Sequence, residues 1–322
     1  MAWTTGNASS AVDLLDKLKT YVTTTVPSGD QWVAERYVTT AGAEELILRG
    51  KGYGATDQIY AGLKAYSDVV SDNFALILNG FTGYNSLLPF YNMPGAMSLA
   101  ELPTCLPSLS SNPVNSTAIK YWFIVDAESI KIITRLGTTY HQAYLGFFLI
   151  YGTPPQYSYR LCVGGSGIVN GSGVPVKQND VTNATHAFWK PIDAFNGTTY
   201  NSHLSALAFK DPAGVWKRLY MTTSSSLGSS YSGSFPYAEG ARAYLGGFDN
   251  MRTNLDGSYA MQSIVIIEGN PANLYGEFSG MKHLTGYQLN PEDEVTYAGD
   301  TYLVIPNVFR TADADMCAYR LV

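Results

Sequence analysis

The sequence predicts a mainly β protein, with an antiparallel β-sandwich core of jelly-roll-like type that follows one N-terminal amphipathic helix. Three observations support this class. Residues 119–151 form an almost continuous run rich in Ile, Val, Tyr, Phe and Trp, which favour strands. Both alternating faces of residues 119–125 are apolar, as is typical of a strand that is covered on each side. Helical periodicity is clear only near the N-terminus.

The helix is expected over residues 9–22, where Ser10 and Asp13 have the spacing of a capping box. An apolar stripe runs along it, formed by Leu14, Leu15, Leu18, Tyr21 and Val22. Such a stripe packs on the core of its own domain or, as the alternative, on a neighbouring subunit. Leu14, Leu18 and Tyr21 are therefore candidate interface residues.

From residue 31 onward, short apolar segments bounded by Gly, Pro, Asn and Ser predict strands. They are 32–38, 45–49, 58–66, 74–81, the hairpin 119–136 with its turn at 126–129, 142–151, 204–210, 216–222, 241–248, 263–268, 274–279, 294–297, 301–305 and 316–321. Long loops are expected at 88–118, 164–185 and 222–236, because Pro or Gly, Ser and Asn dominate there.

These elements divide the chain into three parts. Residues 1–30 form the helical segment, and residues 31–255 form the sandwich core. Residues 256–322 form a C-terminal β subdomain or a continuation of the same sandwich; the sequence leaves both open.

The composition indicates a protein that associates with others. Charged residues make up only 14% of the chain, below the roughly 25% of an ordinary soluble domain. The 24 Tyr outnumber the 20 Lys and Arg together. Tyrosine is common both in strands and at protein interfaces, so either tendency explains this excess.

The charge pattern argues against several partners and compartments. The net charge is −6 and no basic cluster occurs, which argues against direct nucleic-acid binding. No apolar run reaches the length of a membrane span, and no signal peptide is evident. The three widely spaced cysteines favour buried thiols over disulfides or a zinc site, and thus folding in a reducing cytoplasm.

Motifs of known chemistry are weak. The glycine-rich segment 50–54 lacks the following helix of a phosphate site, and the four histidines are scattered, so we expect no cofactor and no metal. Asp126 and Glu128 share a predicted turn, whereas glycoside hydrolysis needs two carboxyl groups facing across a cleft. The sequence therefore predicts a protein that is not an enzyme, with a hydrolase as the third choice.

Several motifs resemble those of virion structural proteins of tailed bacteriophages. They are WVAERY (32–37), ELILRG (45–50), TDQIYAG (56–62), GFTGY (80–84), YHQAYLG (140–146), PPQY (154–157), GG (164–165), VFRT (308–311) and AYRL (318–321). The resemblance covers most of the chain from about residue 32 onward. None of these motifs is catalytic.

The resemblance implies a non-enzymatic structural component of the particle: a homo-oligomeric ring or decoration in the tail, neck or baseplate. Its partners would be further copies and other virion proteins, and it would assemble in the host cytoplasm into the virion. The alternative is a receptor- or carbohydrate-binding module of the tail that contacts a host-surface glycan. Tyr231 and Tyr237, on the predicted loops, would then stack on sugar rings.

Overall fold

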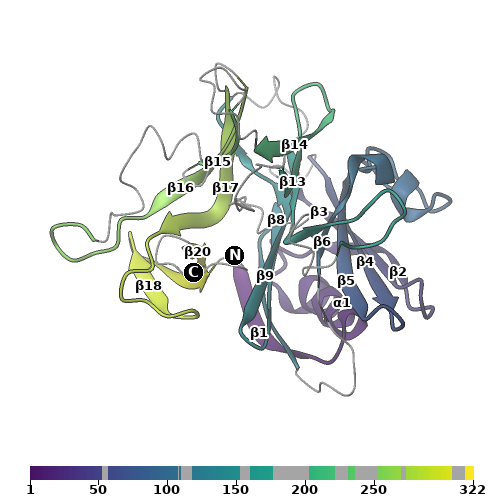
Figure 1. Cartoon of the computed structure of the whole chain (residues 1–322), viewed down its shortest axis with the longest axis horizontal. Coiled ribbons are helices and arrows are strands. Elements are labelled where there is room, and N and C mark those ends of the chain that lie inside the picture. Colours follow the sequence, from purple (N-terminus) through teal and green to yellow (C-terminus); the bar gives the residue numbers. More distant parts are fainter. Residues whose placement is uncertain are drawn as a thin grey trace, which may run out of the picture.

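Figure 1 shows a computed structural model of the chain. The structure describes residues 1–52, 57–107, 109, 118–152, 160–176, 203–221, 231–235, 253–269, 273–306 and 316–322. Within these ranges the chain is mainly β, its strands pair antiparallel, and one α-helix lies near the N-terminus. The predicted class, mainly β with an N-terminal helix, is confirmed at this level.

The strands form three sheets, which we call A, B and C. Sheet A is drawn mainly in teal near the centre of Figure 1 and has seven strands. In spatial order they are β1 (Ala2–Ala8), β7 (Ile119–Val125), β8 (Ser129–Leu136), β9 (Thr139–Phe147), β11 (Leu161–Gly164), β13 (His203–Lys210) and β14 (Trp216–Met221).

Sheets B and C lie on either side of sheet A, at the right and left of Figure 1. The order in sheet B is β12 (Gly167–Ile168), β6 (Thr104–Leu106), β5 (Asn73–Phe81), β4 (Ile59–Asp68), β3 (Glu45–Gly50) and β2 (Val33–Val38). Sheet C contains β15 (Tyr231–Phe235), β16 (Gln262–Gly269), β17 (Asn273–Leu284), β20 (Met316–Arg320), β19 (Asp300–Pro306) and β18 (Glu294–Tyr297), with β10 (Leu149–Ile150) paired to β17.

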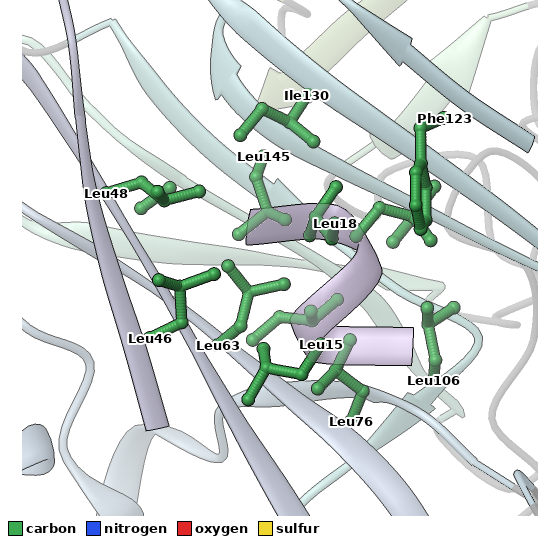
Figure 2. Packing of buried hydrophobic residues seen from close by; sticks show 14 of the residues in the cluster. Leu15, Leu18, Leu46, Leu48, Leu63, Leu76, Leu106, Phe123, Ile130 and Leu145 are labelled. Carbon is green, nitrogen blue, oxygen red and sulfur yellow. The ribbon is translucent and has the colours of Figure 1, made fainter. Parts of the chain in front are cut away.

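The α-helix α1 spans Ala11–Thr20 and continues as a π-helical turn, η1, over Tyr21–Thr25. Ser10 caps it, because its Oγ accepts a hydrogen bond from the Asp13 backbone N–H at 3.1 Å. Figure 2 shows Leu15 and Leu18 of the helix among leucines of sheet B and residues of sheet A. The helix thus packs on the core of its own chain.

This packing corrects the expectation for three candidate interface residues. Leu14 and Leu18 are fully buried and Tyr21 is 8% exposed, all within the core between sheets A and B. A side chain enclosed by its own chain cannot also cover a partner. The apolar stripe therefore stabilises the single chain.

Sheet A is covered on both faces, as the alternation in residues 119–125 predicts. Ile119, Tyr121 and Phe123 face the core shared with sheet B. Trp122 and Ile124 face the core shared with sheet C. Consecutive side chains of β7 therefore enter two different cores.

Most predicted strands are confirmed within a few residues, but β1 was not predicted, and short strands also occur in all three predicted loops. The predicted loop 222–236 contains strand β15, and the predicted strand 241–248 lies outside the described residues. In the predicted exposed loop 164–185, residues 164–169 are buried, and β12 joins the chain to sheet B. A Cβ on Gly165 would lie 2.5 Å from the Cys105 carbonyl oxygen, so glycine there permits close approach of two backbones.

The predicted loop 88–118 is described in its first part. Short 3₁₀ turns, η3 (Phe90–Asn92) and η4 (Leu99–Glu101), lie in this segment. Phe90 and Met93 pack on the outer face of sheet B and bury it. The first part of the segment is thus irregular, as expected, and belongs to a third apolar cluster, but β6 in the same segment is a strand that pairs with β5.

Candidate functional site

A group of ionisable side chains gathers at the turn between β7 and β8, and we call it the turn cluster. Its members are Asp126, Glu128, Ser129 and Lys131. Asp126 Oδ1 accepts hydrogen bonds from the backbone N–H groups of Glu128, at 3.0 Å, and Ser129, at 2.6 Å. An aspartate that accepts from the backbone two or three residues later is a common turn former. The carboxylate therefore shapes the turn.

Lys131 brings a buried positive charge to this turn. Its side chain is fully buried, and Nζ donates to Asp126 Oδ2 at 3.0 Å and to Ser129 Oγ at 2.8 Å. The alternation of β8 turns Lys131 toward sheet C, where Nζ lies 5.6 Å from the centre of the Tyr144 ring. Removal of one partner of such a buried ion pair strongly destabilises the fold, because it leaves the other charge buried without compensation.

Burial alone would raise the pKa of Asp126, but Lys131 and the hydrogen bonds from Ser129 and Glu128 outweigh it. The pKa of Asp126 therefore lies below its usual range. For Glu128, partial burial, reinforced by the nearby negative charges of Asp126 and Asp30, raises the pKa to about 7. Asp126 is ionised at neutral pH, while Glu128 is near the midpoint of its titration.

The turn cluster does not have the geometry of a glycoside hydrolase. Both carboxyl groups come from one tight turn, whereas that chemistry places two carboxyl groups on opposite sides of a substrate. Asp126 is 6% exposed and its oxygens already accept from Ser129 and Lys131. Asp126 therefore stabilises the turn and has no free oxygen exposed for a substrate.

A second polar group, which we call the clamp, joins sheets A and C. Lys120, Arg135 and Tyr140 of sheet A all reach Glu292, which precedes β18. Lys120 Nζ lies 2.6 Å from Glu292 Oε2, and the Tyr140 hydroxyl donates to Oε1 at 2.7 Å. Burial opposes ionisation of Glu292, but these donors together lower its pKa. The clamp links segments more than 150 residues apart in the sequence.

Buried polar atoms without partners lie between sheets A and B. Thr104 Oγ1, Thr134 Oγ1 and both ring nitrogens of His141 are buried, with no hydrogen-bond partner. Thr134 and His141 are directly opposite on β8 and β9. Burial lowers the pKa of His141 to about 4, so its ring is neutral at physiological pH.

The structure settles the placement of several other sequence candidates. Cys105, Cys162 and Cys317 are free, buried thiols, as predicted. Tyr231 is the first residue of β15, and Tyr237 lies outside the described residues. Sequence reasoning identified Asp126 and Glu128 as turn residues but missed Lys131, whose position in a strand alternation gives no sign of its ion pair.

In the described part of the chain, no group of three or more His, Cys, Asp and Glu side chains is arranged to hold a metal ion. Among the described helices, none combines the length and the apolar character needed to cross a membrane. A scan against protein-family models finds no match, and a search of curated proteins finds none either.

Proposed function

We propose that this chain is a non-enzymatic structural component of a tailed-bacteriophage particle. It assembles from copies of itself as a ring or decoration in the tail, neck or baseplate, next to other virion proteins. The motifs that resemble such proteins, 32–37, 45–50, 56–62, 80–84 and 140–146 among them, suggest the class. The finer fold proposal, a jelly-roll-like β-sandwich, is supported by the stacking of its antiparallel sheets.

One observation carries the proposal: the central sheet is enclosed on both faces by sheets of the same chain. Two close-packed cores make a stiff unit, because interiors at this density deform little. The buried ion pair of the turn cluster holds a hairpin together, and the partly exposed clamp joins two layers. Such stiffness suits a load-bearing part of a particle.

The test is the assembly state of the purified chain. Sedimentation velocity over a range of concentrations should show self-association, and the protein should co-sediment with tail components of its particle. A monodisperse monomer at high concentration that binds none of these components would contradict the proposal.

The tail module that binds a glycan is the alternative, and it makes a separate prediction. A glycan-binding chain would retain soluble oligosaccharides of the host surface on an affinity column whether or not it oligomerises. A structural component would not retain them. Location of labelled copies in particle images, at a tail tip or along the tail, distinguishes the two further.

A further inference from the structure

The outer edges of the sheets differ in how well they resist pairing with another strand. An exposed edge strand offers free backbone N–H and C=O groups, and proteins usually protect it with charges, bulges or short length. In sheet B, β2 carries a register shift between Ala34 and Arg36, and an ion pair from Arg36 to Glu45. In sheet C, β18 has only four residues and begins with Glu294. These edges are protected.

Strand β1, at one edge of sheet A, lacks all three protections. It is seven residues long, AWTTGNA, with no charged residue and no proline. Its register with β7 is unbroken from Ala2–Val125 to Ala8–Ile119. Within the described residues, sheet A has no strand beyond β1.

The chain holds this strand firmly in place. Gly6 lies directly opposite Tyr121, whose ring occupies the space that a Cβ on Gly6 would need, at 2.6 Å from the Tyr121 hydroxyl oxygen. The other end of the strand, Ala8, is buried against the core that contains α1. On the opposite face, Trp3, Thr5 and Asn7 are exposed. Within the described part of the chain this edge is fixed, uncharged and unprotected, so it can accept a further strand.

We propose that β1 pairs antiparallel with β1 of a second copy, so that two sheets A join into one continuous sheet. A two-fold axis at Thr5 places Thr5 opposite its counterpart and Trp3 opposite Asn7 of the second copy. Self-pairing brings together no like charges, because β1 carries none. The pairing deepens the proposed function, since it names the contact between copies and rests on that self-association.

The symmetry also limits what this contact builds. A two-fold contact uses the same surface on both copies and closes after two. It therefore supplies a dimeric unit within the particle, and a ring requires a second, different contact. The exposed face with Trp3 remains on the surface of the joined sheet.

Substitution at the axis tests the pairing. Thr5→Lys places two positive charges opposite each other, and we expect the dimerisation constant to weaken by about fivefold. Thr40→Lys is the matched control. Thr40 is an exposed threonine in the loop after β2, and its substitution by lysine adds the same charge away from β1. Circular dichroism checks that both variants fold. Equal dimerisation of Thr5→Lys and wild type would overturn the proposal.

A crosslink tests the register. Opposed residues of an antiparallel pair have Cα atoms about 4.5–5.5 Å apart, within reach of a disulfide. Thr5→Cys should therefore form a covalent dimer under mild oxidation, while Thr40→Cys should not. The three native thiols are buried, so they do not compete. A Thr5→Cys dimer no more abundant than that of Thr40→Cys would overturn the β1 contact.

The two tests separate this inference from the proposed function. A wild-type chain that self-associates while Thr5→Cys fails to crosslink would preserve the assembly proposal and reject β1 as the contact. A wild-type chain that is monomeric at all concentrations would reject both. If β1 instead accepts a strand from a different protein, the purified chain is monomeric. That outcome also counts against self-pairing.

Discussion

The two faces of sheet A are buried by different means. The core toward sheet B is rich in leucine, includes helix α1, and contains buried polar atoms of Thr134 and His141 that have no partner. The core toward sheet C is rich in aromatic rings and is crossed by hydrogen bonds, as from Tyr319 to Gln142 and in the clamp at Glu292. Hydrogen bonds also cross the leucine-rich core, as from Trp32 Nε1 to the Asp126 carbonyl oxygen at 2.8 Å. The faces differ in that Thr134 and His141, on the side of sheet B, have no partner, whereas Tyr319 and Gln142, on the side of sheet C, bond to each other. Substitutions on the two faces should therefore differ in size, sign and pH dependence.

The largest effect is expected for the helix in the leucine-rich core. Leu18→Ala should lower the free energy of unfolding by about 2–5 kcal/mol, because a fully buried leucine leaves a cavity. Urea denaturation measures the change. The control Thr20→Ala, at an exposed position of the same helix, should change it by less than about 0.5 kcal/mol. A similar small change for both variants would show that α1 is not part of the core.

The next largest effect is expected in the pH dependence of stability, through the titration of His141. Its pKa is about 4 in the fold against 6.5 in the unfolded chain, so the contribution of its neutral ring is complete above pH 6.5. That contribution is lost as the pH falls toward 4, and it amounts to about 3 kcal/mol. Glu128 acts in the opposite sense: its pKa is raised to about 7, so its contribution is complete below pH 4.5 and is lost as the pH rises through 7.

These opposing titrations should nearly cancel in the wild type between pH 4.5 and 6.5. Removal of the histidine in His141→Leu should make stability fall as the pH rises through this window. Glu128→Gln should make it rise. Unfolding midpoints in urea at three pH values within the window measure both slopes. Parallel pH profiles for the two variants would refute this assignment.

Paired polar substitutions should have opposite signs on the two faces. Tyr319→Phe leaves Gln142 Oε1 buried without its donor, at a cost of about 1–3 kcal/mol. Thr134→Val replaces an unpartnered buried hydroxyl with a methyl group of the same shape, and we expect a gain of about 1 kcal/mol. Thermal and urea unfolding of both variants check the signs. Destabilisation by Thr134→Val as large as that by Tyr319→Phe would remove the contrast between the faces.

The clamp should give the smallest effect. Glu292→Gln keeps the shape of the side chain but removes its charge, and the partly exposed pairs with Lys120 and Arg135 are worth about 1 kcal/mol or less. The loss should shrink in concentrated salt, which screens such pairs. An effect of several kcal/mol that is independent of salt would mean that the clamp carries more of the contact between sheets A and C than its exposure suggests.

The sequence predicted the doubly covered sheet because its signal is local. The alternation of Tyr121 and Phe123 with Trp122 and Ile124 is enough to show that both faces of β7 are buried. Strand β1 was missed because Thr, Gly and Asn interrupt its sequence, and its pairing depends on β7, more than 100 residues away. The glycines at 165 and 167 also looked like loop residues, although they permit sheets A and B to meet.

The turn cluster was predicted only in part, for a similar reason. Asp126 and Glu128 stand in a recognisable turn, and the turn was confirmed. The burial of Lys131 depends on sheet C, since Gly280 of β17 lies beside its Nζ. No local sequence pattern predicts a contact between residues so far apart in the chain. Leu14, Leu18 and Tyr21 of the helix were likewise expected at an interface but are buried in the core of their own chain. An apolar stripe does not specify which surface covers it.

Amide hydrogen exchange, followed strand by strand, tests the central claim that sheet A is enclosed by its neighbours. Residues 119–125 and 130–136 should exchange last, at rates set by global unfolding, while the outer strands β2 and β18 exchange earlier. Exchange of β7 and β8 as fast as that of β2 and β18 would contradict the account.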